Sequence, residues 1–207
     1  MIRLSVVGGA LLVVFLLLGY LVRSSVTSID AVVSEALGGF WQQPASSFVF
    51  VLTDILGPVL PIVVLVILVV ACLRAWRSGQ RKLADLLLRS IVLLATCRAV
   101  SLFKDVYGRE RPRVYAADWS YPSGHVVSVS SVAFTGVVLC AWLARHLLRR
   151  AIVLAVAVVA VAAACRVLLD VHWVTDVLGG VVGVTGIGLV VASALKLIPV
   201  GERRVSG

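Results

Sequence analysis

The chain has 207 residues, of which 61% are hydrophobic and only 14% are charged, and its mean hydropathy is +1.09. These values exclude an ordinary soluble globular domain and indicate that lipid surrounds most of the chain. The formal charge of +9 does not point to nucleic acid, because the Lys and Arg residues fall in short clusters between apolar runs, as in membrane proteins that follow the positive-inside rule.

The apolar runs predict an all-α protein, a polytopic membrane bundle with about six transmembrane helices. A β-barrel is not favoured, because its short alternating segments are missing from the pattern. The first run is longer than the apolar core of a signal peptide and lacks a convincing cleavage site, so we expect a retained span. The predicted spans are residues 4–22, 49–73, 83–103, 126–143, 151–169 and 174–197.

The stretch between the first two spans, residues 23–47, has apolar spacing that allows a short interfacial helix, and the sequence assigns it no role. The four cysteines lack metal-ligand spacing, so we interpret them as small buried hydrophobes. Neither an internal repeat nor a linker interrupts the chain. We therefore expect one domain over residues 1–207, with the functional motifs within 104–176.

Basic clusters follow the second, fourth and sixth predicted spans, so these ends and both termini should be cytoplasmic. The opposite ends carry mixed charges in residues 104–122 and 166–176, and these two segments should share the extracytoplasmic face. The basic residues that set this orientation are Arg74, Arg77, Arg81, Lys82, Arg145, Arg149, Arg150, Lys196, Arg203 and Arg204.

The segment after the third predicted span carries Lys104 and Arg111, seven positions apart. On a helix this spacing is about two turns, so both cations would point the same way. Pro112 favours a helix end at Arg111. An ammonium and a planar guanidinium together suit a phosphate. Taken alone, the segment is more typical of a solvated charge run beside a membrane.

A turn marked by Pro122 and Gly124 precedes the fourth predicted span. Ser123 stands where an N-cap belongs, and the free N–H groups of the helix start would form an anion site with His125 in the first turn. A serine cap is also a common way to begin a helix. The interpretation as an anion site is favoured because Lys104 and Arg111 are predicted on the same face of the membrane.

The junction of the fifth and sixth predicted spans contains Arg166, His172 and Asp176. His172 and Asp176 are one helical turn apart, which lets the carboxylate reach an imidazole nitrogen and leaves the other nitrogen free to attack. A capped, salt-bridged helix start explains this segment equally well. Ionisable residues at membrane depth are functional candidates by default, however, and two such segments meet on one predicted face.

Three concurrent motifs, in order and with matching spacing, resemble the signature of the type 2 phosphatidic acid phosphatases, which share a superfamily with the vanadium haloperoxidases. The third motif of that family begins Ser-Arg, whereas Cys165 precedes Arg166 here, which puts one phosphate hydrogen bond in doubt. Residues 52–57 resemble the family only loosely. The motifs are Lys104-x6-Arg111-Pro112, Pro122-Ser123-Gly124-His125 and Arg166-x5-His172-x3-Asp176.

The resemblance implies a membrane lipid phosphatase that uses a phosphohistidine and neither metal nor other cofactor. His172 would attack phosphorus, Asp176 would orient it, and His125 would protonate the leaving oxygen and then activate water. The implied phosphate-binding residues are Lys104, Arg111, Ser123, Gly124 and Arg166.

The membrane setting predicts a lipid phosphate that enters from the outer leaflet, so substrate and bilayer are the expected partners, and the oligomeric state stays open. Small bacterial proteins similar to this chain act on undecaprenyl pyrophosphate, phosphatidylglycerol phosphate or phosphatidate; the compact chain favours a polyprenyl pyrophosphate. A lipid transporter or scramblase is the alternative, since polar residues inside a bundle also line lipid paths, but it leaves the paired histidines unexplained. Haloperoxidase chemistry is disfavoured because the haloperoxidases of the superfamily are soluble.

Other charged residues near the motifs are interpreted as structural. We expect Arg89 and Arg98, within the third predicted span, to snorkel or to form ion pairs, with Asp85 as a candidate partner. Loop charges or head-group contacts are expected at Asp105, Arg109, Glu110, Arg113 and Asp118.

Overall fold

The computed structural model describes residues 2–113 and 118–199, without the side chains at 52 and 56. Six helical segments of this part are long and apolar enough to cross a membrane. This confirms the predicted all-α, polytopic membrane bundle. The six segments are Ile2–Val22, Gly57–Arg77, Arg81–Tyr107, Gly124–Leu143, Arg145–Leu168 and Val174–Ala194.

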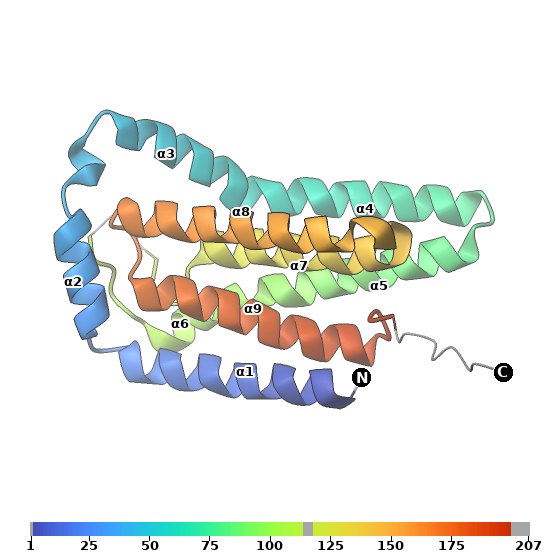
Figure 1. Ribbon diagram of the computed structural model, residues 1–207, viewed down its shortest axis with the longest axis horizontal. Coiled ribbons are helices and arrows are strands. Elements are labelled where there is room, and N and C mark those ends of the chain that lie inside the picture. Colours follow the sequence, from blue (N-terminus) through green and yellow to red (C-terminus); the bar gives the residue numbers. More distant parts are fainter. Residues whose placement is uncertain (1, 114–117, 200–207) are drawn as a thin grey trace.

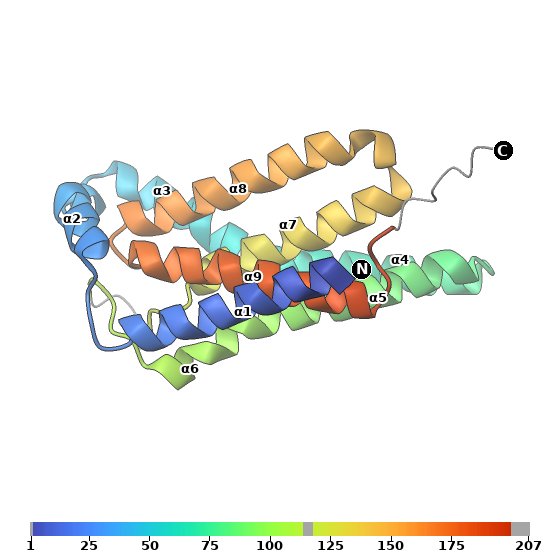
Figure 2. The same cartoon turned by 60° about the horizontal axis from the view of Figure 1, so that its bottom comes forward.

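The long helices run side by side along one axis of the molecule (Figures 1 and 2). Helix α1 (Ile2–Val22) packs along α9 (Val174–Ala194), and the start of α1 lies at the same end of the bundle as the end of α9. The hairpin between α4 (Leu60–Arg77) and α5 (Arg81–Arg98) also turns at this end (Figure 1). We call it the basic end, because the clusters after the second and fourth spans gather there.

The opposite end of the bundle holds the three motifs, and we call it the motif end. Helix α7 (Gly124–Leu143) begins at the motif end and runs to the basic end. There the short turn η4 (Arg145–Leu147) reverses the chain, and α8 (Leu148–Leu168) returns to the motif end. Helix α2 (Ser28–Leu37) lies across the motif end (Figure 1), so the predicted short helix within residues 23–47 is present. Its N-cap is Thr27, whose hydroxyl accepts a hydrogen bond from the Asp30 N–H at 3.2 Å.

The predicted second span, 49–73, is wrong at its start. After the turn η1 (Phe40–Gln42), helix α3 (Ala45–Asp54) runs at an angle to α4, and the π-helical turn η2 (Ile55–Val59) joins them (Figure 1). Pro58 lies inside this turn, where it removes a backbone donor and prevents a regular helix. The apolar run therefore continues through a bend that its hydrophobicity does not reveal.

The predicted third span, 83–103, is too short. Helix α5 continues through the tighter turn η3 (Ala99–Phe103) into α6 (Lys104–Tyr107), so Lys104 lies within the helical segment and not beyond it. Gly108, with φ of 58° in the left-handed region, ends this segment. The chain then enters the loop that carries the rest of the first motif.

Close packing around small residues fixes α1 against α9 and fixes the segment before α7 against both helices. A Cβ atom on Gly8 of α1 would lie 2.8 Å from the carbonyl oxygen of Gly186 on α9, so the two backbones approach closely. A Cβ on Gly179 would lie 2.3 Å from the ring of Tyr121, which is fully buried. The Tyr121 hydroxyl donates to the Phe15 carbonyl at 2.7 Å. This aromatic ring anchors the segment before α7 against α1 and α9.

Candidate active site

The three motifs converge at the motif end, around a cavity of about 310 Å³. Its walls come from four separate parts of the chain: η2, the continuous segment of α5, η3, α6 and the loop after α6, the start of α7, and the end of α8. The convergence predicted from the charge pattern is therefore present. Five of the predicted site residues line the cavity, namely Lys104, Arg111, Gly124, His125 and Arg166.

His172 lies beside this cavity, just before the N-cap of α9, Trp173, and not on the helix as its spacing from Asp176 suggested. Its side chain is buried, and Nε2 lies 3.2 Å from Nη1 of Arg111, which donates to the Val171 carbonyl at 2.7 Å. Burial lowers the pKa of His172 to about 3, because the charged imidazolium is poorly solvated and Arg111 lies close to it. The imidazole is therefore neutral at pH 7.

Asp176 is completely buried in the first turn of α9. Its Oδ2 accepts hydrogen bonds from the Trp173 N–H at 2.8 Å and from the Ser120 hydroxyl, while Oδ1 accepts one from Arg109 at 2.6 Å. Oδ2 also lies 3.4 Å from Nδ1 of His172, within ion-pairing distance but without hydrogen-bond alignment. The predicted proximity of this carboxylate and imidazole is present, held by contacts that the sequence did not reveal.

His125 lies in the first turn of α7, on the wall of the cavity. Its Nε2 is 3.3 Å from Oδ1 of Asp54, the last residue of α3. Gly57 in η2 lies against the ring, since a Cβ there would be 2.1 Å from Cδ2 of His125. Residues 52–57, which resembled the family only loosely in sequence, thus contribute both a partner and space for this histidine.

Lys104 and Arg111 meet at one carboxylate, that of Asp118. Lys104 Nζ bonds this carboxylate and donates to the Trp119 carbonyl at 2.7 Å, and Arg111 Nη2 lies 2.5 Å from Asp118 Oδ1. Burial alone would raise the pKa of Asp118, but the two cations hold it below its ordinary value. The expected common helix face is wrong, because Gly108 ends the helix first, and Asp118 is a bridge between cations and not a plain loop charge.

The remaining predicted phosphate-binding groups surround the start of α7. Ser123 is the N-cap residue as predicted, yet its hydroxyl does not cap the helix, and this buried oxygen has no partner in the described ranges. Arg166 is buried and donates to the Thr53 hydroxyl at 3.2 Å. A Cβ on Gly124 would lie 3.5 Å from Cε of Lys104. Cys165, which replaces the usual serine, is half-buried and is not among the described residues that line the cavity.

Arg109 differs most from its predicted role, because it is buried and not a loop charge. Its guanidinium lies between two buried carboxylates, 2.6 Å from Asp176 and 2.8 Å from Asp30. Both ion pairs join residues more than sixty positions apart, so no local spacing signals them.

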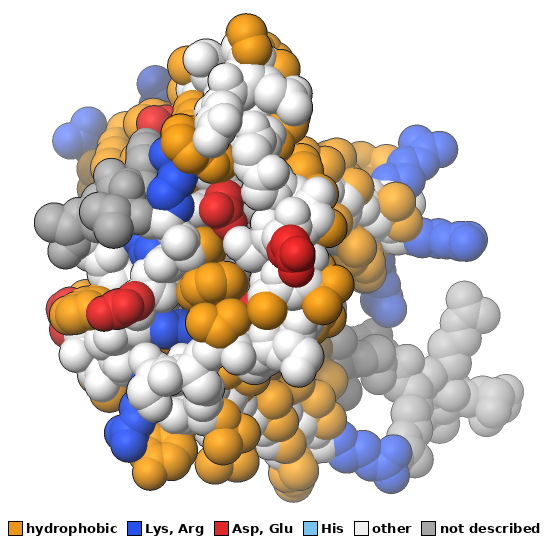
Figure 3. Space-filling view, turned by 90° about the vertical axis from the view of Figure 1, so that its left-hand side faces the viewer, with side chains coloured by type: hydrophobic (Ala, Val, Ile, Leu, Met, Phe, Trp, Pro, Cys, Tyr) orange, Lys and Arg blue, Asp and Glu red, His pale blue; other side chains and the backbone are white. Residues whose placement is uncertain are grey.

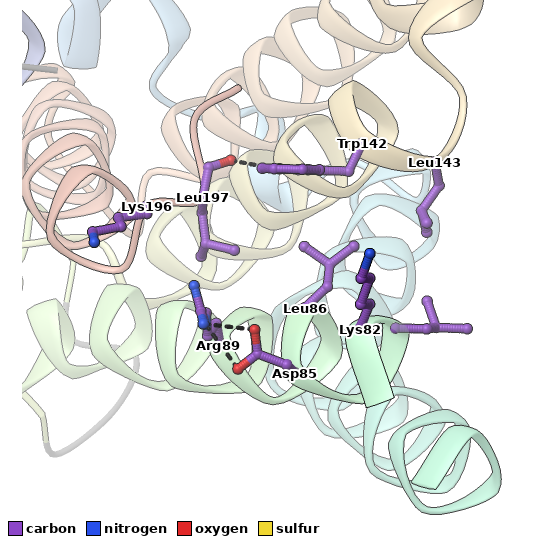
Figure 4. A pocket seen from close by; sticks show the side chains of 9 residues that line it. Lys82, Asp85, Leu86, Arg89, Trp142, Leu143, Lys196 and Leu197 are labelled. Carbon is purple, nitrogen blue, oxygen red and sulfur yellow. Dashed lines mark hydrogen bonds and ion pairs between the residues drawn. The ribbon is translucent and has the colours of Figure 1, made fainter. Parts of the chain in front are cut away.

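Other predicted structural charges divide into two groups. Arg89 pairs with Asp85 at 2.6 Å, as predicted, on the wall of a separate cavity at the basic end (Figure 4). Arg98, by contrast, lines the cavity at the motif end. Arg113 lies over the ring of Trp41, 4.1 Å from its centroid.

Seen end-on, the motif end shows acidic and basic side chains interspersed with hydrophobic ones (Figure 3). No histidine atoms are on view in this projection, in agreement with the burial of His172. His172 and Asp176 are buried, whereas the His125 side chain is 23% exposed.

Comparison with known proteins identifies the family of the chain. The family model of the PAP2 superfamily matches residues 85–199, more than half of the chain, so the chain belongs to this superfamily, the type 2 phosphatidic acid phosphatases. The protein is thus a membrane-embedded lipid phosphatase, a hydrolase of phosphoric esters. No curated protein sequence matches it.

A solved structure supports the assignment along most of the chain. The transmembrane PAP2-type phosphatidylglycerolphosphate phosphatase from Bacillus subtilis is 25% identical, with a TM-score of 0.68. The match covers 91% of this chain and 94% of that chain. The structural likeness therefore includes the N-terminal helices that the family model leaves out.

Proposed function

We propose that this lipid phosphatase works through a phosphohistidine on His172. Neutral Nε2 would attack phosphorus, forming an N–P bond as the P–O bond to the lipid breaks, and His125 would give its proton to the leaving oxygen. The observation that carries the proposal is the position of Nε2, 3.2 Å from Nη1 of Arg111. A phosphoryl group bound to this guanidinium would lie within attacking distance of a neutral nucleophile.

In the second step, water attacks phosphorus, His125 takes its proton, and the N–P bond breaks to release inorganic phosphate. Asp176, 3.4 Å from Nδ1, would stabilise the positive charge on the phosphorylated His172. The carboxylate of Asp54, 3.3 Å from Nε2 of His125, would accept a hydrogen bond from the imidazole ring and orient it.

The phosphoryl oxygens would be held by protein groups alone, without a metal. Lys104, Arg111 and Arg166 would supply positive charge for an in-line displacement. The buried Ser123 hydroxyl and the N–H of Gly124 at the helix start would add hydrogen bonds. The substrate must displace the carboxylate of Asp118 from two of these cations.

We extend the proposal to lipids whose leaving group carries a second phosphate, such as a polyprenyl pyrophosphate or phosphatidylglycerol phosphate. Arg98 lies one to two turns below Lys104 on the same helical segment and lines the cavity that contains His125, the proposed donor to the leaving group. Its Nη1 is buried without a hydrogen-bond partner among the residues the structure describes. An unmatched cation at membrane depth is costly, and an anion in the leaving group would compensate it.

The cavity should face the extracytoplasmic side. It lies at the motif end, opposite the clusters of Lys and Arg that positive-inside topology assigns to the cytoplasm. Its wall includes Arg98 and Ser128, which belong to membrane-spanning helices, so a lipid phosphate would enter from the outer leaflet.

The test is hydrolysis by purified protein in detergent of a polyprenyl pyrophosphate, phosphatidylglycerol phosphate and phosphatidate, with and without a chelator. We expect full activity in chelator and a loss of about a thousandfold or more in His172→Asn that still elutes as folded protein. Arg98→Gln should lower kcat/KM for the first two substrates about tenfold and leave phosphatidate unchanged, which would support a subsite for the second phosphate. A strict magnesium requirement, or an active His172→Asn variant, would overturn the mechanism.

A further inference from the structure

Helix α2 carries a buried acid, Asp30, that contacts the site. This helix lies before residue 85, where the match to the family model begins. Asp30, in the first turn of α2, is 1% exposed, and it lies in the N-terminal segment before residue 85. A buried carboxylate is costly unless it is paired and hydrogen-bonded. Its contacts therefore show what the site gains from it.

Asp30 binds the first turn of α9 and Arg109 together. Its Oδ1 accepts the Thr175 N–H at 3.0 Å, and its Oδ2 accepts the Thr175 hydroxyl at 2.7 Å and Arg109 Nη2 at 2.8 Å. Burial alone would raise the pKa of Asp30, but the Thr175 N–H and the Arg109 guanidinium lower it. Asp30 is thus an anion at neutral pH.

Arg109 carries the effect of this carboxylate to the site. Through Nη1 it donates to Oδ1 of Asp176 at 2.6 Å and to the Thr175 hydroxyl at 2.6 Å, while Nη2 faces Asp30. A planar guanidinium held at both nitrogens has one orientation. Arg109 thereby holds Oδ1 of Asp176, while Oδ2, which also accepts from the Trp173 N–H and the Ser120 hydroxyl, faces His172.

We infer that Asp30 and Arg109 are positioning residues for the reaction, which together fix the carboxylate of Asp176 against His172. This inference rests on the proposed role of His172 as nucleophile. Without Asp30, Asp176 would be the one carboxylate still paired with the guanidinium in the described contacts, and the guanidinium would neutralise the negative charge that stabilises the positive imidazole ring. The phosphate-binding groups would keep their places, so kcat should fall while KM stays nearly constant.

The experiment is a double-mutant cycle on the full-length protein in detergent. Asp30→Asn should lower kcat on the order of 10- to 100-fold in the parent, but less than about threefold in the Asp176→Asn background, because the effect acts through that carboxylate. Arg109→Lys keeps the charge but loses the planar fork, so it should lower kcat as well. It also provides a second test if Asp30→Asn fails to fold.

Two acids provide matched controls. Glu35 is exposed on the same helix, and Asp85 lies in the ion pair at the basic end (Figure 4). Glu35→Gln and Asp85→Asn should keep the parent's kcat. Equal losses from Asp30→Asn in both backgrounds, or a rise in KM at constant kcat, would overturn the inference. An active His172→Asn variant would instead refute the proposed mechanism, so the two failures are distinguishable.

Discussion

At the scale of single residues, the burial of His172 predicts how stability depends on pH. Its pKa is lowered to about 3 in the folded protein, from an ordinary value of 6.5. Between pH 6.5 and pH 3 the unfolded state binds a proton at His172 that the folded state does not bind. The free energy of unfolding therefore falls as the pH drops below about 6.5, and His172 causes no further loss below about pH 3. We expect the melting temperature in detergent to fall from pH 7 to pH 4.5 more steeply for the parent than for His172→Gln.

His146 provides the control for this measurement, because it is exposed in the turn η4 at the basic end. His146→Gln should keep the steep slope of the parent. Identical slopes for the parent and His172→Gln would show that the buried imidazole does not control the acid response.

The carboxylate of Asp118 occupies the cations proposed to bind phosphate. Because its pKa is held below the ordinary value, it competes as an anion throughout the neutral range. Asp118→Asn should therefore lower KM by about 3- to 10-fold with little change in kcat, since exposed ion pairs are individually weak. Steady-state kinetics at constant ionic strength would measure this. Asp105→Asn, an exposed acid in α6, is the control, and a raised KM in Asp118→Asn would contradict the competition.

Spacing along the chain explains which residues could be predicted. The signature residues His125, His172 and Asp176 stand in short motifs whose chemistry is visible locally. Asp30 and Asp54 were missed because their partners lie 79 and 71 positions away. A buried acid in one helix and a loop arginine give no sequence signal of pairing, and only tertiary packing brings them together.

At the scale of the elements, the π-helical turn η2 makes room for His125. A Cβ on Gly57 would lie 2.1 Å from the imidazole Cδ2, so Gly57→Ala must displace the ring. A misplacement of about 1 Å at a reacting group costs on the order of 100-fold, so we expect kcat to fall about 10- to 100-fold. Kinetics and a melting curve on the same sample would separate this effect from unfolding.

The matched control is Gly136→Ala on α7, where a Cβ would meet no atom within 4 Å. It should be as active as the parent and no less stable, since alanine favours a helix interior over glycine. If Gly57→Ala were equally active, the close contact with His125 would not matter for catalysis.

Helices were easier to predict than the turns between them. Apolar length alone identifies the spans, because each must cross about 30 Å of hydrocarbon. The apolar run at 49–73 does not reveal the bend at Pro58, because the helices on both sides of it are apolar. The third span continues past its apolar run to Tyr107, and Gly108 ends the helix before Arg111, where Pro112 favoured the end.

At the scale of the whole molecule, the long helices separate the basic end from the motif end, which holds the proposed chemistry (Figure 1). Helix α2 closes the motif end and brings Asp30 to residues that the family model matches. The N-terminal helices are therefore part of the site as well as of the membrane anchor. The structural match to the Bacillus subtilis phosphatase likewise includes these helices, since it covers 91% of the chain, whereas the family model begins at residue 85.

The central claim is that His172 carries the phosphoryl group during turnover, and rapid quenching with a ³²P-labelled lipid phosphate tests it most directly. We expect a protein-bound label, stable to alkali and labile to acid, on the peptide that contains His172. His125→Ala should prolong the label with a substrate whose leaving group needs no proton, and His172→Asn should abolish it. Turnover without a label on that peptide, or a label that persists in His172→Asn, would contradict the account.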